Sequence, residues 1–212
     1  MDDLHVISGA RMLAEAKYEP GEDDISKIKE IVYGDLVKYL GVEGYPEDGI
    51  SDFSEANIND LVYSVISTIL WSFRCKTGRN VLLQREKEII SKDGETGGRE
   101  EFVVTDRVGV GEEQFVLMVD GKESSLEQAR MQCLLALKDM RDSNGEGKVY
   151  GFVTTGESWR MLSYDGTFQM TNVMQLTFHT MSEEKETWMK DYSVVVDCIY
   201  AALSSGGHCG GD

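Results

Sequence analysis

The apolar residues of this chain change their spacing twice along the sequence, and this change sets the fold class. Residues 54–73 carry apolar side chains on one broad face at helical spacing. Residues 80–90, 100–108 and 114–122 show the spacing of strands, with polar turns between them. Helical spacing returns over 123–141. This order predicts an α/β fold with a mixed central sheet flanked by helices.

The flanking segments add further elements to this core. Residues 25–40 predict an amphipathic helix, and 41–52 predict a loop. Residues 148–155 and 158–165 predict a hairpin, 168–178 a further strand and 188–203 a closing helix. We therefore expect an acidic helical segment at 1–50, an α/β domain at 51–204 and a flexible glycine-rich tail at 205–212.

The formal net charge of −17 restricts the partners of the protein. Residues 1–50 alone hold 12 acidic and 5 basic side chains. Because phosphate contacts dominate nucleic-acid affinity, such a surface as a whole repels nucleic acid. Contacts to phosphate would need a local basic group, for which the candidates are Arg74, Lys76, Arg79, Arg85 and Lys87. A basic protein partner is the alternative that suits the charge directly.

The sequence also bears on the compartment. No apolar run approaches the roughly 20 residues of a membrane span. The first residues lack the basic and apolar regions of a signal peptide. The four cysteines are scattered without a Cys-x-x-Cys pair, which favours a reduced intracellular compartment, the cytoplasm or nucleus.

Charged residues follow two of the predicted strands and form a candidate site. Asp120 and Lys122 are two positions apart, so they lie on one face of their strand. Asp106 ends the preceding strand, and if the two strands pair antiparallel we expect it to converge with Asp120. Two carboxylates are hard oxygen ligands that suit Mg²⁺ or Mn²⁺. A lysine beside them can hold a water nucleophile or a phosphate oxygen.

Asp106, then Asp120-Gly121-Lys122 on the next strand, then a helix, resembles the PD-(D/E)xK signature of restriction-endonuclease-like proteins. The segment VYGFVTTGESWRML (149–162) is similar to a strand pair of fungal and oomycete members, including Crinkler-type effector domains. The resemblance covers about residues 54–165. It implies a Mg²⁺-dependent nuclease that hydrolyses phosphodiester bonds in DNA or RNA.

The resemblance also implies roles for individual residues. Glu55, Asp106 and Asp120 would ligate the metal, Lys122 would orient or activate water, and Gln132 would support the site, with Gln128 one helical turn before it. Two positions depart from the pattern. Thr105 stands where the motif has proline, and Gly121 between the two key residues is unusual because glycine loosens a strand.

Alternatives without chemistry stand beside this interpretation. Asp120-Gly121 also suits a type I′ turn at the surface. Glu55 also favours the start of its helix through the helix dipole. The fold as a whole could belong to an inactive relative that acts as a protein-interaction module or as an effector in a host cell.

Overall fold

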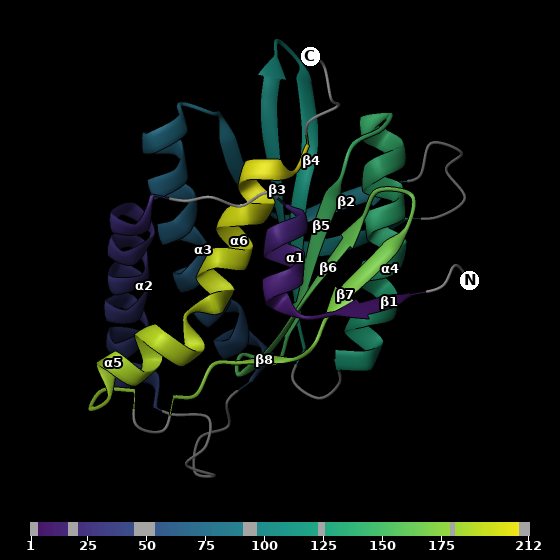
Figure 1. The fold of residues 1–212 in the computed structure, drawn as a ribbon. Helices are drawn as coiled ribbons and strands as arrows, with labels where there is room; N and C mark the ends of the chain where they lie inside the picture. Colours follow the sequence, from purple (N-terminus) through teal and green to yellow (C-terminus); the bar gives the residue numbers. More distant parts are fainter. Residues whose placement is uncertain are drawn as a thin grey trace.

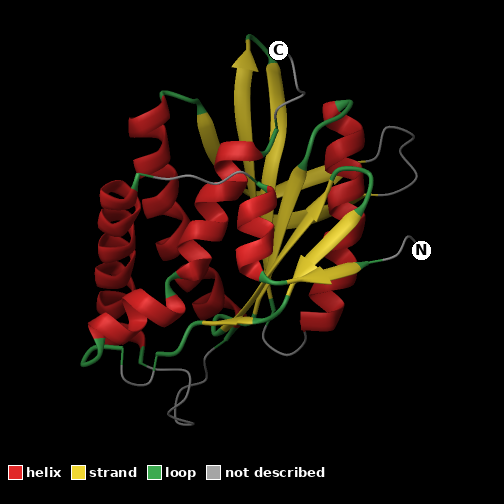
Figure 2. Ribbon diagram, viewed as in Figure 1, coloured by secondary structure: helices red, strands yellow, loops and turns green. Residues whose placement is uncertain are grey.

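The computed structural model describes residues 4–16, 21–44, 54–90, 97–122, 126–178 and 181–207, without the side chains of Glu22 and Gln128. Its centre is one mixed sheet, which confirms the predicted α/β class (Figures 1 and 2). The strands run in the order β1-β7-β6-β5-β4-β3-β2, and β8 pairs with β6. The pairs β4–β5 and β1–β7 are parallel, and the other pairs are antiparallel. The strands are β1 (His5–Ile7), β2 (Val81–Ile90), β3 (Gly97–Gly109), β4 (Glu112–Gly121), β5 (Val149–Thr154), β6 (Ser158–Tyr164), β7 (Phe168–Thr171) and β8 (Met174–Gln175).

Helices cover both faces of this sheet and create two apolar cores. They are α1 (Gly9–Glu15), α2 (Glu22–Glu43), α3 (Glu55–Thr77), α4 (Leu126–Asn144), α5 (Lys185–Thr187), the π-helical turn η2 (Trp188–Tyr192) and α6 (Val194–Ser205). Helices α2, α3 and α6 share one core with strand residues such as Phe102 and Val119, here the α3-side core. Helix α4 packs on Val103 and Met118 of the opposite face, here the α4-side core.

Helix α3 forms where the helical spacing predicts it, and its ends are set by local chemistry. Ser54 is the N-cap, and its backbone N–H donates to Asn57 Oδ1 at 3.0 Å. Gly78 ends the helix with φ 71°, a left-handed conformation that glycine adopts without steric cost. The apolar face from Ile58 to Phe73 is buried. The helix therefore fixes Glu55 in its first turn.

The structure departs from the predicted boundaries in three places. Helix α2 continues to Glu43, so the loop prediction is wrong for residues 41–43, and 45–53 lie outside the described residues. Strand β1 was not predicted, and the strand expected at 168–178 is divided into β7 and β8. The closing helix is confirmed, with a π-helical turn at its start.

The described parts of the two terminal segments belong to the main body of the fold. Strand β1 pairs with β7, and α2 packs against α3. Of the expected glycine-rich tail, Gly206 and Gly207 are buried, and a Cβ added to Gly206 would lie 2.9 Å from a Val116 methyl carbon. Residues 208–212 lie outside the described residues.

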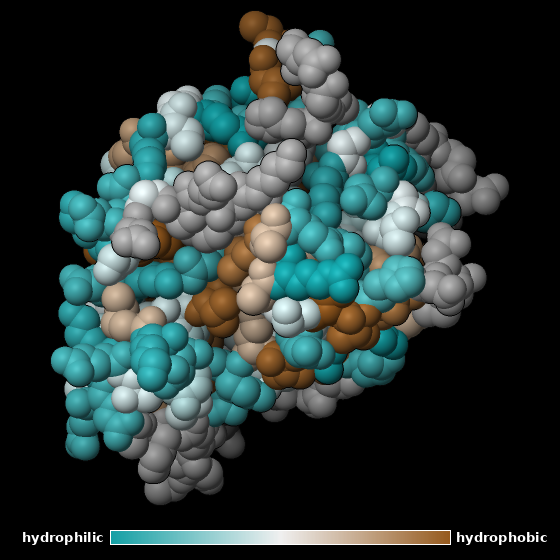
Figure 3. Space-filling view, viewed as in Figure 1, coloured by the Kyte–Doolittle hydropathy of each residue, from teal (hydrophilic) through white to brown (hydrophobic). Residues whose placement is uncertain are grey.

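The β3–β4 hairpin extends beyond the body of the protein. Val108 and Val110 near its tip are exposed, and Figure 3 shows hydrophobic side chains at the top of the view, where this hairpin ends. None of the helices in the described ranges is both long and apolar enough to cross a bilayer.

Candidate functional site

Asp120 and Lys122 lie where β4 ends, inside the sheet. The parallel pairing of β4 with β5 continues to Gly121, opposite Thr154, and the Lys122 N–H donates to the Thr154 carbonyl at 2.9 Å. The type I′ turn is therefore wrong for Asp120-Gly121. Asp120 is 3% exposed and shares the α4 face of the strand with Met118.

Lys122 joins two of the predicted acids. Its Nζ lies 3.1 Å from Asp120 Oδ1 and 3.2 Å from Glu55 Oε1. Burial acts to lower the pKa of Lys122, but the charges and hydrogen bonds of Asp120 and Glu55 outweigh it and raise the pKa above its ordinary value. Lys122 is therefore a protonated ammonium group in this arrangement. It supplies positive charge and hydrogen-bond donors, because a protonated amine cannot accept a proton.

A pocket of about 420 Å³ opens beside these residues, between the first residues of β3, the end of β4 and helix α4. Gln132 of α4 lines this pocket, as the resemblance implies. The structure thus brings Glu55, Asp120, Lys122 and Gln132 to one end of the sheet. The lining residues are Ile89, Gly97, Gly98, Arg99, Glu100, Glu101, Asp120, Lys122, Gln132, Leu135, Ala136 and Asp139.

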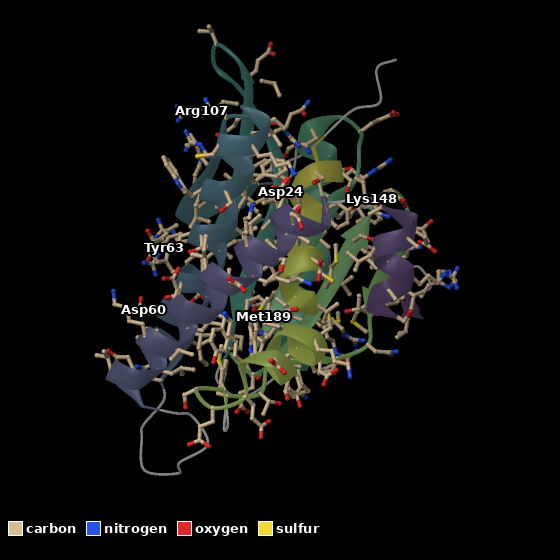
Figure 4. All side chains as sticks on the ribbon, turned by 60° about the vertical axis from the view of Figure 1, so that its left-hand side comes forward. Asp24, Asp60, Tyr63, Arg107, Lys148 and Met189 are labelled. Atoms are coloured by element: carbon tan, nitrogen blue, oxygen red, sulfur yellow. The ribbon has the colours of Figure 1, made fainter. Side chains whose placement is uncertain are left out.

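Asp106 lies elsewhere, so the expectation that it converges with Asp120 is wrong. Asp106 pairs with Gln114, six residues before Asp120, which corresponds to about 20 Å along the strand. In Figure 4, Arg107, the residue after Asp106, lies at the hairpin end of the molecule, far from Asp60 near the start of α3. The physical reason is the strand register, because the end of one antiparallel strand meets the beginning of its neighbour.

Asp106 instead forms a structural ion pair. Arg79 Nη2 lies 2.8 Å from Asp106 Oδ2, and Arg79 Nε donates to the same oxygen. The Arg79 guanidinium also donates to the carbonyls of Leu203 and Gly206. Asp106 and Arg79 therefore tie the end of α6 to the sheet.

Glu100 and Glu101 are the acids that the sequence analysis missed. Both line the pocket at the start of the strand that runs antiparallel to β4. Burial, and next the negative charge of Asp120, raise the pKa of Glu100 from 4.5 to about 7. Burial also raises the pKa of Asp120, although Lys122 opposes this shift. The rule that opposite strand ends meet was the signal that could have identified these two glutamates.

The same acids bear on metal binding. In the described part of the chain, no three His, Cys, Asp or Glu side chains form a ready-made metal site. Asp120 and Glu100 nevertheless offer hard oxygen donors in one pocket, and burial raises the pKa of both carboxyl groups although Lys122 acts to lower it. This donor chemistry fits Mg²⁺ or Mn²⁺.

The unusual Gly121 has a steric explanation. A Cβ at this position would lie 3.0 Å from Ile58 Cγ2 and 3.1 Å from Asn59 Oδ1. Asn59 Nδ2 in turn donates to Glu101 Oε1 at 3.1 Å. Glycine at position 121 therefore lets the first turns of α3 approach the sheet and hold Glu101.

The expected basic group does not reach the pocket. Lys76 is paired with Asp24, Lys87 with Glu113 and Arg79 with Asp106. Arg85 lies over the ring of Phe102 and over that of Tyr63 of α3, which Figure 4 shows at the outside of the molecule. The cations that line the pocket, among the described residues, are Lys122 and Arg99.

No protein-family model matches the sequence, and no curated protein matches it.

Proposed function

We propose that this protein is a metal-dependent nuclease, as the PD-(D/E)xK resemblance implies. The observation that carries the proposal is the group at the end of β4, where Lys122 bridges Asp120 and Glu55 beside the buried Glu100. A half-buried ammonium group held between carboxylates in an open pocket is an arrangement suited to phosphoryl chemistry. The order of helix, three antiparallel strands, helix and parallel strand also agrees with the resemblance.

Each residue of the group has a role in this proposal. Asp120 and Glu100 would hold Mg²⁺ or Mn²⁺, and Glu55 would complete the set after release from Lys122. When bound, the cation would neutralise the carboxylates and polarise a phosphate oxygen. Lys122 would hold the attacking water or a phosphate oxygen by donated hydrogen bonds. Gln132 would support the same pocket from α4.

The charge of the pocket requires that a metal cation bind before nucleic acid does. Glu100, Glu101 and Asp120 line the same pocket as Lys122, so phosphate meets a surface rich in carboxyl groups before a cation binds. We therefore expect weak nucleic-acid affinity in EDTA and a strong gain with Mn²⁺ or Ca²⁺. This expectation reconciles a net charge of −17 with a phosphate substrate.

A cleavage assay with two lysine variants tests the proposal. Wild type, Lys122→Met and Lys148→Met are incubated with single- and double-stranded DNA and RNA in Mg²⁺ or Mn²⁺. Lys148 is the matched control, because its side chain is 21% exposed against 27% for Lys122 and it also faces an acid, Asp165. We expect metal-dependent cleavage by wild type and Lys148→Met, and a loss of about 100-fold or more in Lys122→Met.

The alternative is a nuclease fold without activity that binds a basic protein. The observation that favours it is the pairing of Lys76, Arg79 and Lys87 with acids, which leaves little free positive charge for phosphate. Wild type that cleaves none of the four substrates with either metal would contradict the nuclease proposal and leave this alternative in its place.

A further inference from the structure

Along β2 and β3, the side chains reverse the face of the sheet to which they point between the middle of the sheet and the pocket. Arg85 pairs with Phe102, and Phe102 belongs to the α3-side core. Because side chains alternate along a strand, the next pair on that face, Lys87 and Glu100, would also point toward α3. Glu100 instead lines the pocket beside α4, and Ile89, which pairs with Gly98, belongs to the α4-side core.

The reversal coincides with an unusual backbone at Glu86. Glu86 has φ 52°, and no other non-glycine residue in the described ranges has a positive φ. The register of β2 and β3 contains the pairs 85–102 and 87–100 but omits Glu86 and Glu101 between them. A left-handed residue within a strand interrupts the pleat, so the chain beyond it can present its opposite face.

The Glu86 side chain gives no reason for this conformation. Its carboxylate lies 3.5 Å from Arg99 Nη1, and the two side chains are 73% and 70% exposed. Exposed ion pairs of this kind contribute little to stability. The local contacts of Glu86 do not compensate for its strained backbone. Such a backbone points to a role in placing other residues.

The reversal sends neighbouring glutamates to opposite sides of the sheet. Both glutamates border the pocket, but Glu101 accepts a hydrogen bond from Asn59 of α3, whereas Glu100 lies beside Asp120 on the α4 side. Strict alternation would reverse these two directions and leave Asp120 without Glu100. Strand β2 accordingly begins beside α3 and ends beside α4 (Figures 1 and 2).

We propose that Glu86 is a positioning residue whose left-handed backbone reverses the side-chain directions at the paired ends of β2 and β3 and so places Glu100 in the pocket. The role of Glu100 as a metal ligand rests on the proposed function, but the reversal of the side-chain directions does not. The property that matters at position 86 is tolerance of positive φ, and the carboxylate is dispensable.

Four variants separate backbone from side chain. Glu86→Gly accepts positive φ, Glu86→Val opposes it through its β-branch, and Glu86→Gln keeps the shape without the charge. Glu88→Val is the matched control, because Glu88 is exposed two residues further on the same strand and its φ is not positive. Glu86→Ala, which lacks the β-branch, replaces Glu86→Val if that variant does not fold.

Two measurements are made on each variant. Methyl NOEs between Ile89 and Ala136 of α4 report whether the strand end faces α4, without any metal. Mn²⁺ titration calorimetry reports the pocket. We expect Glu86→Gly to melt about 1–4 °C higher than wild type, with NOEs retained and Mn²⁺ affinity within about twofold. Glu86→Val should lose the NOEs and bind Mn²⁺ about 10-fold more weakly or worse, whereas Glu86→Gln and Glu88→Val should behave as wild type.

The outcomes distinguish this proposal from the nuclease proposal. If Glu86→Val keeps the NOEs, or if Glu86→Gln loses them, the positioning role of the backbone is overturned. If wild type binds no Mn²⁺ but Glu86→Val alone loses the NOEs, the positioning role stands and the metal-dependent function falls.

Discussion

Replacement of Asp106 by alanine should destabilise the protein without weakening metal binding. The Asp106 and Arg79 side chains are 8% and 18% exposed, and two guanidinium nitrogens contact one carboxylate oxygen. Removal of one partner from a buried ion pair costs about 3–5 kcal/mol. In this variant Arg79 still donates hydrogen bonds to the carbonyls of Leu203 and Gly206, so we expect the lower end of this range, about 3 kcal/mol. For a protein of this size, that corresponds to a melting temperature about 6–12 °C lower.

Thermal unfolding and Mn²⁺ titration of Asp106→Ala and Asp120→Ala test this reasoning. Asp120→Ala should show the reverse pattern, with a smaller loss of stability and strongly reduced Mn²⁺ affinity, because Lys122 keeps Glu55 as a partner and the change relieves repulsion with Glu100. In a double-mutant cycle with Arg79→Met, the double variant should be little less stable than the worse single variant. The reasoning is refuted if Asp106→Ala keeps the wild-type melting temperature and loses Mn²⁺ affinity as Asp120→Ala does.

Three further predictions concern the pocket. In EDTA, the free energy of unfolding should fall by at most about 3 kcal/mol as pH rises from about 4.5 to 7, because folded Glu100 keeps a proton that the unfolded chain releases. Urea unfolding at pH 5 and 8 should show this decrease in wild type. An equal decrease in Glu100→Gln would contradict the prediction. Mn²⁺ should raise the melting temperature of wild type by mass action, and equal shifts in Asp120→Asn would indicate non-specific binding. Gly121→Ala should lower the free energy of unfolding by about 1–3 kcal/mol, because the added methyl group meets Ile58 and Asn59. Gly34→Ala should raise it by up to about 1 kcal/mol, because Gly34 lies within α2 with open space beside it. Chemical denaturation of both variants checks the contrast.

The layers of the fold can be predicted from the sequence because the spacing of apolar residues indicates which side chains are buried. Helix α3 keeps apolar residues on one face from Ile58 to Phe73, and polar turns separate the apolar segments of the three strands after it, so the order of elements can be predicted from the sequence. Strand β1 was missed because three residues, two of them exposed, leave no periodic pattern. Its position in the sheet depends on pairing with β7, which a local pattern does not contain.

The candidate site could be predicted only in part because it depends on strand register. Asp120 and Lys122 are neighbours on one strand, so their spacing was sufficient to place them together. The partner acid depends on how β3 pairs with β4, and this pairing includes a shift between Val104 and Thr105. The face of Glu100 further depends on the positive φ of Glu86, and glutamate is not a residue that signals a left-handed backbone.

The pairing of β1 with β7 has a consequence for the order in which the chain folds. The hairpins of β2, β3 and β4 join segments close in sequence, whereas β1 must wait for a partner that begins at Phe168. Contacts between such distant segments form late, because they carry a large loop-closure entropy. Until β1 docks, the outer edge of β7 presents unpaired N–H and C=O groups, which can recruit a strand from another molecule. During synthesis and refolding, the short N-terminal strand therefore acts as a cover against self-association.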